Sequence, residues 1–224
     1  HRRTLGQISL GPKRASMSDQ QDGLEGGNPP SLESAFSYQS FQRYWTARLC
    51  STLAIQMQAV AIGWQIYDLT RDPLDLGLVG LAQFLPSLGL ALITGHVADR
   101  YDRRTVMALC SIVEALCAVL FLIFTLQGGT NTLFLFGVLV LFGIARAFEF
   151  PASVALMPNL VPQRLFTNAA AWSSSAWQAA TIVGPAIGGL LYAVGTGTVY
   201  GCCALMFGAS IFLVSIIHIE KREA

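Results

Sequence analysis

The chain has 224 residues, of which 53% are hydrophobic and 12% carry a charge, and its formal net charge is +1. Soluble domains carry about 25% charged residues, so this composition excludes an ordinary soluble enzyme, and it excludes disorder over most of the chain. The small net charge provides no basic field for nucleic acid, so no nucleic-acid partner is expected.

The first forty residues differ from the rest of the chain. Residues 1–30 mix glycine, proline, serine and acidic or amide side chains without periodicity, which is typical of disorder. Phe41, Tyr44 and Trp45 then recur at helical spacing, as in a segment at a membrane surface. We therefore expect a disordered tail over residues 1–40 and a membrane domain over residues 41–219.

Long apolar stretches separated by short polar joints fill that membrane domain. Each stretch is close to the ~20 residues that a helix needs to cross ~30 Å of hydrocarbon. The sequence therefore predicts an all-α membrane protein with six transmembrane helices. The predicted spans cover residues 47–67, 74–97, 105–126, 132–157, 168–193 and 198–218.

Basic residues outside these spans gather on one side of the predicted topology. Six of the fourteen Lys and Arg residues precede residue 50, and the joint after the second span adds Arg100, Arg103 and Arg104. Arg71 is the single basic residue in a joint on the other side. Because cytoplasmic loops carry the excess of Lys and Arg, both termini are expected to be cytoplasmic. The expected location is the cytoplasmic (inner) membrane.

The first span carries a polar stripe. Gln58 and Gln65 are seven residues apart on one helical face, and Ser51 lies on nearly the same face. Such a stripe suits a water-lined substrate path, which makes Gln58 a candidate substrate or coupling residue. Hydrogen bonding between helices is the other reading of the same pattern.

The joint between the second and third spans combines a glycine, an acid and three arginines at fixed offsets. Gly95 would allow a close approach to a neighbouring backbone, and Asp99 could pair with an arginine or accept from a helix N-terminus. The three arginines alone could serve only to keep this joint on the cytoplasmic side of the membrane; they are Arg100, Arg103 and Arg104. That explanation leaves Gly95 and Asp99 unexplained.

Three charged residues lie deep inside predicted spans, far from either end. Arg146 is roughly 20 Å from the outer edge of the fourth span, and Glu149 lies on the same helical face. A charge at this depth costs at least about 2.5–3.5 kcal/mol, so Arg146 should face a cavity or a partner. Glu114, near the midplane of the third span, could bind a proton. A structural ion pair and a helix–helix hydrogen bond are the alternative roles for these residues.

The fifth span presents small residues at close spacing. Ala180, Gly184 and Gly188 recur every four residues and would form one smooth face for helix contact, with Gly189 beside them. Pro185 removes one backbone donor and can bend the helix. We expect Gly184, Pro185, Gly188 and Gly189 to form a helix-packing motif.

The remaining chemistry-bearing residues point to no enzyme and no cofactor. The five cysteines lie in apolar stretches without metal-ligand spacing, and the His96–Asp99 pair has no third ligand nearby. No P-loop, nucleophile elbow, zinc-protease motif or dinucleotide fingerprint is present. Any transport would therefore use an ion gradient or the gradient of the substrate itself.

Two of these motifs resemble those of a known family. The pattern G-x-x-x-D-R-x-x-R-R over residues 95–104 is similar to the signature loop of the major facilitator superfamily, although Asp102 stands where that loop usually has glycine. The fifth-span sequence Gly184-Pro185-x-x-Gly188-Gly189 resembles the GPxxGG motif of family members that exchange substrate for protons. The fuller motif has glycines where this chain has Ala171 and Ala180.

Further segments resemble the enterobactin-exporter-type subgroup of this superfamily, namely residues 67–70, Pro86 and residues 150–162. The resemblance implies an amino-terminal six-helix half built as a 3+3 inverted repeat, and efflux of a small hydrophobic or amphipathic molecule, drug-like or siderophore-like, by proton antiport. Asp99 and Arg103 would form a latch in this scheme. Arg146 corresponds to a recurrent fourth-span arginine linked to proton coupling.

The resemblance covers one half of a twelve-span transporter. Residues 220–224 would then begin the central linker, and the partners would be the lipid bilayer, the substrate, protons, and a missing carboxy-terminal half. A six-span chain that pairs with a second copy is a different expectation. A non-transporting membrane scaffold or partner subunit is a third.

Overall fold

The computed structural model describes residues 34–217, apart from the side chains of residues 92, 98 and 99. This part of the chain forms six long α-helices: α2 (Gln39–Thr70), α3 (Pro73–Arg100), α4 (Arg103–Leu126), α5 (Thr132–Leu156), α6 (Phe166–Val194) and α7 (Thr196–Ser215). Three short 3-10 helices accompany them: η1 (Ala35–Ser37), η2 (Met157–Asn159) and η3 (Gln163–Leu165). Within these residues, six helices are long and apolar enough to cross a membrane, as the sequence predicts.

Local sequence signals set several helix ends. Asp72, Asp102 and Asn131 cap α3, α4 and α5, because each side chain accepts a hydrogen bond from a backbone N–H of the following turn. Arg71 ends α2 in the left-handed conformation, with φ of 57°. The helices overlap the six predicted spans, but α2 begins well before residue 47 and α7 ends before residue 218.

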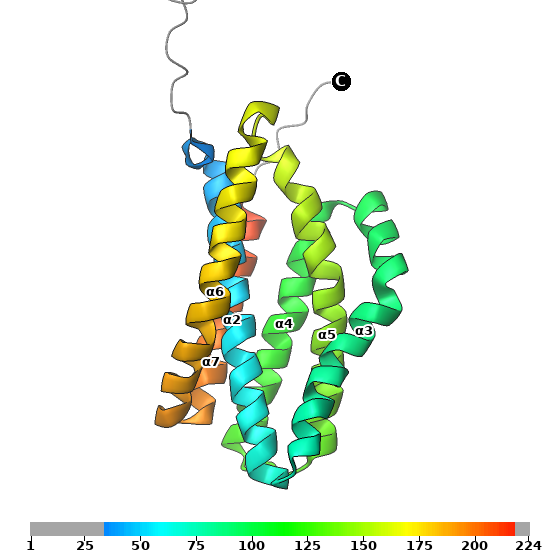
Figure 1. The fold of residues 1–224 in the computed structure, drawn as a ribbon, viewed down its shortest axis with the longest axis vertical. Helices are drawn as coiled ribbons and strands as arrows, with labels where there is room; N and C mark the ends of the chain where they lie inside the picture. Colours follow the sequence, from blue (N-terminus) through cyan, green and yellow to red (C-terminus); the bar gives the residue numbers. More distant parts are fainter. Residues whose placement is uncertain (1–33, 218–224) are drawn as a thin grey trace, which may run out of the picture. The chain divides into compact units, whose positions relative to one another are not determined.

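Successive helices run in opposite directions, so the joints alternate between the two ends of the bundle (Figure 1). The described chain starts and finishes at the end that holds the α3–α4 and α5–α6 joints. We call it the arginine-rich end, because its joints and flanking turns contain Arg43, Arg100, Arg103, Arg104 and Arg164. The opposite end holds the α2–α3, α4–α5 and α6–α7 turns.

The helix contacts show a repeat of two triplets, α2–α4 and α5–α7. Helix α2 packs against α6 and α7, α5 packs against α3 and α4, and α4 packs against α7. Exchanging α2 with α5, α3 with α6 and α4 with α7 returns the same set of pairs. Because α2 and α5 run in opposite directions, the triplets are inverted, and the expected 3+3 inverted repeat is confirmed.

Two glycines bring α6 close to α2. A Cβ atom built on Gly184 would lie 2.5 Å from Cβ of Gln56, and one on Gly188 would lie 2.9 Å from Cα of Met57. These positions require glycine, since no larger residue fits the approach of the two backbones. Gly189 differs, because a Cβ there would meet nothing within 4 Å. The predicted packing face therefore includes Gly184 and Gly188, but its extension to Gly189 is wrong within the described residues.

Three prolines lie inside helices, Pro86 in α3, Pro151 in α5 and Pro185 in α6. Each lacks the N–H that would bond the carbonyl four residues earlier, which weakens the helix at that turn. Helix α3 visibly changes direction along its length in Figure 1. Pro151 also lines the cavity described below, so the interrupted turn of α5 faces that space.

The ordered bundle begins earlier than residue 41. Ala35 is fully buried, and its N–H donates to Oδ1 of Asn168 on α6 over 3.1 Å. The Phe36 ring makes edge contacts with Trp45 and Trp172, with ring centroids 5.2 and 5.0 Å apart. The boundary placed at residue 40 is therefore wrong, because the aromatic side chains of this segment pack against two helices. Residues 1–33 and 220–224 lie outside the described residues.

Candidate functional site, a charged cavity between four helices

A cavity of about 660 Å³ lies between α2, α3, α5 and α6. Its lining combines charged, amide and aromatic side chains from these four helices. The charged and amide members are Arg48, Gln56, Gln83, Arg146 and Glu149, and the aromatic members are Phe84, Phe150 and Trp177. The volume is in the range of small-molecule sites, which are commonly ~300–1,000 Å³.

Arg146 and Glu149 line this cavity from α5, so the expectation that Arg146 faces a cavity agrees with the structure. Nη1 of Arg146 donates to Oε1 of Gln83 on α3 over 3.4 Å. Gly143 makes this contact possible, because a Cβ there would lie 2.8 Å from the Gln83 carbonyl oxygen. Arg146 and Glu149 share a helix face, but they form no ion pair within 4.0 Å in the part of the chain that the structure describes.

Arg48 on α2 is a second cavity arginine. Its guanidinium donates to the hydroxyl of Ser153 on α5, and its Cζ lies 5.8 Å from the centre of the Phe150 ring. The phenol of Tyr44 donates to the Ser153 carbonyl over 2.9 Å, which joins α2 to α5 again. Arg48 is one of the six basic residues before residue 50, which the sequence predicts to be cytoplasmic charges. Its position inside the first predicted span was the signal for a buried role.

Glu114 is fully buried in α4 and does not line the cavity. Neither carboxyl oxygen has a hydrogen-bond partner, and the same holds for the hydroxyl of Ser111 one turn away. Glu149 and Arg146 are the charged neighbours of Glu114. The interhelical hydrogen bond considered for Glu114 is therefore not formed by the described residues, while the carboxyl lies within electrostatic reach of the charged part of the cavity.

The polar stripe of α2 faces away from the cavity. Ser51 donates to Oγ of Ser210 on α7 over 2.8 Å, and Nε2 of Gln65 donates to Oγ1 of Thr125 on α4 over 2.9 Å. Gln58, between them, is buried, and its amide has no hydrogen-bond partner. The expectation of a water-lined path along this stripe is wrong, because the stripe packs against α4 and α7. Gln56, two residues earlier, is the cavity glutamine.

At the arginine-rich end, two arginines of the signature-like loop bond the C-terminal turns of other helices. Nη1 of Arg103 donates to the Ala155 carbonyl of α5 over 3.0 Å. Nε of Arg104 donates to the Val214 carbonyl of α7 over 3.1 Å, and its Nη2 donates to the Ser215 carbonyl. Helix C-termini carry unpaired carbonyls and a partial negative charge, so these contacts stabilise the ends of α5 and α7.

The other loop residues behave differently. A Cβ on Gly95 would meet nothing within 4 Å, so the close backbone approach expected there is absent from the described residues. Arg100 is exposed, and the Asp99 side chain lies outside the described part, so its pairing and the His96–Asp99 pair are untested. No group of three His, Cys, Asp or Glu side chains among the described residues could hold a metal ion.

Asp102, the residue that departs from the family pattern, caps α4. Its Oδ2 accepts from Oγ1 of Thr105 over 2.6 Å and from the Thr105 N–H over 3.1 Å. The hydrogen bond from the Thr105 hydroxyl lowers the pKa of this carboxyl, and the backbone bonds act in the same direction while partial burial opposes them. An aspartate therefore starts the helix where a glycine would only permit the turn.

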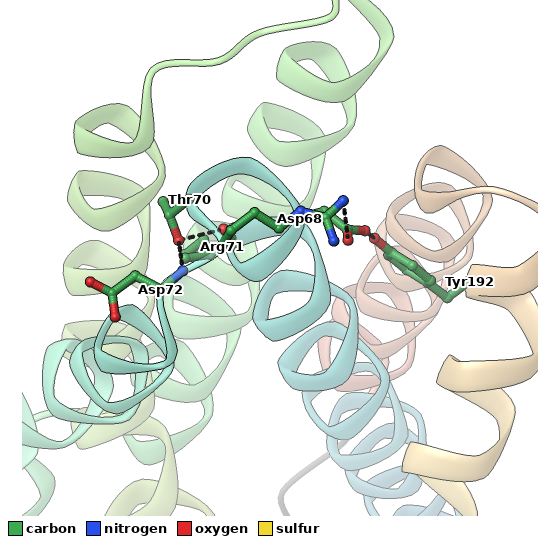
Figure 2. Close-up of polar contacts among 6 residues, drawn as sticks. Asp68, Thr70, Arg71, Asp72 and Tyr192 are labelled. Atoms are coloured by element: carbon green, nitrogen blue, oxygen red, sulfur yellow. Dashed lines mark hydrogen bonds and ion pairs between the residues drawn. The ribbon is translucent and has the colours of Figure 1, made fainter.

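A second polar cluster lies at the opposite end of the bundle, and Figure 2 shows its contacts. Asp68, near the end of α2, accepts a 2.9 Å hydrogen bond from the phenol of Tyr192 on α6 and lies 3.6 Å from Nη2 of Arg71. The rings of Tyr192 and Trp64 are also close, with centroids 6.4 Å apart. These contacts join a helix of the first triplet to a helix of the second.

The inverted triplets and the charged cavity define a polytopic membrane protein with the architecture of a major facilitator half-domain. Residues 31–224 match the family model of transmembrane secretion effectors, and the chain belongs to this family of the major facilitator superfamily. The family and its named relatives are transporters, not enzymes.

Three relatives illustrate the range of named functions. Macrolide efflux protein A of Streptococcus pyogenes is 28% identical over 154 residues, which cover 69% of this chain and 38% of the relative. Multidrug efflux pump Tap of Mycolicibacterium fortuitum is 29% identical over 175 residues, with 74% and 42% covered. The staphyloferrin A transporter of Staphylococcus aureus is 25% identical over 169 residues, with 73% and 42% covered. The chain thus spans about two fifths of the length of these relatives.

Proposed function

We propose that this chain is the amino-terminal six-helix half of a proton-coupled exporter of small hydrophobic or amphipathic molecules, of the enterobactin-exporter type. The proposal rests on one observation. Arg48, Arg146 and Glu149 line a cavity between helices that are otherwise apolar enough to cross a membrane. Charged side chains inside a membrane are costly and mark substrate or ion pathways. The relatives named for macrolide, multidrug and siderophore transport support the same reading.

Glu114 and Glu149 are the proposed proton carriers. A carboxylate buried without a hydrogen-bond partner costs several kcal/mol, so Glu114 would hold its proton in this conformation. Because Arg146 neighbours both acids, its movement toward or away from the cavity would change how readily each one ionises. Such an arrangement lets a conformational change of the bundle load and release a proton. Gln58 has no role in this scheme, because it is buried and does not line the cavity.

The arginine-rich end would act as the cytoplasmic gate. Arg103 and Arg104 stabilise the ends of α5 and α7, and the loop that carries them also contains Asp99 and the exposed Arg100. We propose that Asp99 and Arg103 form the latch and that the open surface at Gly95 receives a neighbouring helix from outside the six-helix unit. We propose that this end and both termini face the cytoplasm and that the protein lies in the inner membrane, because an excess of basic residues marks the cytoplasmic side of a membrane protein.

The cavity would need a cover from a second set of helices. The relatives are more than twice as long as the aligned stretch, and a major facilitator site lies between two six-helix halves. We propose that a second six-span half, or a second copy of the chain, closes the cavity. A scaffold or partner subunit without transport activity is the competing function, and it predicts that Glu114, Arg146 and Glu149 can be neutralised without functional loss.

Flux measurements test the proposal. The full natural protein would be reconstituted in proteoliposomes with an imposed pH gradient. Uptake would be followed for fluorescein, rhodamine 123 and a radiolabelled macrolide. We expect gradient-dependent flux of at least one of these compounds, and we expect Glu114→Gln to abolish the gradient dependence while leaving insertion intact.

Ser111→Ala is the matched control, because it alters a buried, unpartnered side chain of the same helix that does not titrate. Absence of gradient-dependent flux for all three compounds, or normal coupling in Glu114→Gln, would refute the proposed mechanism.

A further inference from the structure

The cavity has an imbalance of charge. Two guanidinium groups, Arg48 and Arg146, line it together with a single carboxyl group, Glu149. The hydrogen bonds described for the two arginines go to neutral oxygens, those of Ser153 and Gln83. The described residues contain one ion pair within 4.0 Å, and it joins Arg71 to Asp68 at the opposite end of the bundle. Glu114 lies outside the lining and is proposed to hold its proton, so at least one positive charge of the lining has no counter-charge among the described residues, even when Glu149 is ionised.

An uncompensated guanidinium within a membrane domain favours an anion as its partner. Each guanidinium has five N–H donors in a planar fork that matches the two oxygens of a carboxylate, and few of these donors are used by the protein contacts described above. Glu149 is the charged neighbour shared by Arg48 and Arg146, so both guanidinium groups lie within electrostatic reach of one carboxyl group. An anionic group bound beside Glu149 would be attracted by both arginines.

The rest of the lining is suited to a flat apolar body. Phe84, Phe150 and Trp177 expose 60%, 60% and 49% of their surfaces, respectively. Phe150 also lies under the Arg48 guanidinium, which places an aromatic face directly beside a positive charge. Aromatic rings provide stacking area for a planar ligand, and the adjacent arginine fixes the position of its charged end.

We propose that this cavity takes an amphipathic anion: a molecule whose carboxylate or similar group binds Arg48 and Arg146 while its apolar part packs on Phe84, Phe150 and Trp177. The inference rests on the proposed transport function and narrows its substrate class. A cation of the same shape would meet two positive charges and one carboxyl, so the cavity discriminates against it.

Binding without a pH gradient tests this inference separately from transport. The full natural protein would be placed in nanodiscs of neutral lipid, with empty nanodiscs as the blank. The probes would be fluorescein, an anion, and rhodamine 123, a cation built on a similar fused-ring scaffold, and binding would be read by fluorescence anisotropy. We expect fluorescein to bind at least tenfold more tightly than rhodamine 123. We expect Arg48→Gln and Arg146→Gln each to weaken fluorescein binding about tenfold, as for the loss of one charge-assisted contact.

Arg71→Gln is the matched control, because it removes an arginine at the exposed opposite end of the bundle and should leave the affinity unchanged. Equal or tighter binding of rhodamine 123, no binding of either dye, or equal losses in the Arg71 and cavity variants would each overturn the inference. Where a cavity variant does not fold, the dye preference of the unaltered protein still decides. Gradient-driven flux of rhodamine 123 or a macrolide without fluorescein binding would retain the transport function and reject the anionic substrate class.

Discussion

Adjacent glycines of α6 provide a direct test of the α2–α6 contact. Replacing Gly188 with Ala would place a Cβ 2.9 Å from Cα of Met57 and 3.0 Å from its carbonyl oxygen. Both atoms belong to the backbone, so no side-chain rotation relieves the overlap, and α6 must move away from α2. The same replacement at Gly189 meets nothing within 4 Å. Both variants replace a glycine with an alanine at neighbouring positions of the same helix. They therefore differ only in what the new methyl group contacts.

The magnitude follows from two opposing terms. Alanine gains about 0.5–1 kcal/mol over glycine in a helix interior, because it restricts the unfolded chain. Overpacking a tight contact costs about 1–3 kcal/mol. We therefore expect Gly188→Ala to lower the free energy of unfolding by about 1–2 kcal/mol. A loss of that size lowers Tm by about 2–8 °C for a unit of 150–250 residues, such as the six-helix half. Gly189→Ala should leave Tm unchanged or raise it.

The assay is thermal unfolding of the purified natural protein in detergent, followed by circular dichroism. Size-exclusion chromatography after each heating step would separate unfolding from aggregation. Equal Tm shifts for Gly188→Ala and Gly189→Ala would refute the reasoning, since the described contacts would then not limit stability. Gly184→Ala repeats the test against the Gln56 side chain, 2.5 Å from the new Cβ, and should also be destabilising.

Two further predictions concern the ends of the bundle. Tyr192→Phe removes the hydrogen bond to Asp68 and should lower the free energy of unfolding by about 0.5–1.5 kcal/mol. A double-mutant cycle with Asp68→Ala, which removes the acceptor, should recover most of that loss as coupling energy, and additive losses would show that the two groups do not interact. Asp102→Ala removes the cap of α4 and should cost about 1 kcal/mol at neutral pH. Because hydrogen bonds from Thr105 lower the pKa of Asp102, its contribution is fully present above the ordinary aspartate pKa of about 3.9 and is lost as the pH falls toward the lower pKa of the folded protein. The difference between Asp102→Ala and the unaltered protein should therefore shrink as the pH is lowered in a series of unfolding curves, and a difference independent of pH would exclude a role for the ionised carboxyl.

Much of the fold could be predicted from the sequence. Span number and approximate limits follow from the length of each apolar stretch, because the thickness of the hydrocarbon fixes the length of a crossing helix. The depth of Arg146 follows in the same way, and the cost of a charge in hydrocarbon then predicts that it faces a cavity, where the structure places it. The family followed from the spacing of the loop and fifth-span motifs, and the family match confirms it.

The composition of the site depended on which helix faces meet. Gln58 and Gln56 are both polar residues of the first span, yet Gln58 is buried outside the cavity lining and Gln56 lines the cavity. The sequence does not distinguish Gly188 from its neighbour Gly189. In the structure a Cβ on Gly188 would contact α2, whereas one on Gly189 would meet nothing within 4 Å. In a soluble protein the apolar stripe of a helix would identify its buried side.

That signal fails here because lipid-facing and protein-facing surfaces are both apolar, so the hydrophobic pattern gives the position of a residue along the helix but not its direction around it. The sequence by itself therefore determined the number, length and depth of the spans and the presence of charges within them. The tertiary structure alone decided that Arg48 joins Arg146 and Glu149 in one cavity, because that grouping depends on α2 lying beside α5, where Tyr44 and Arg48 both bond Ser153.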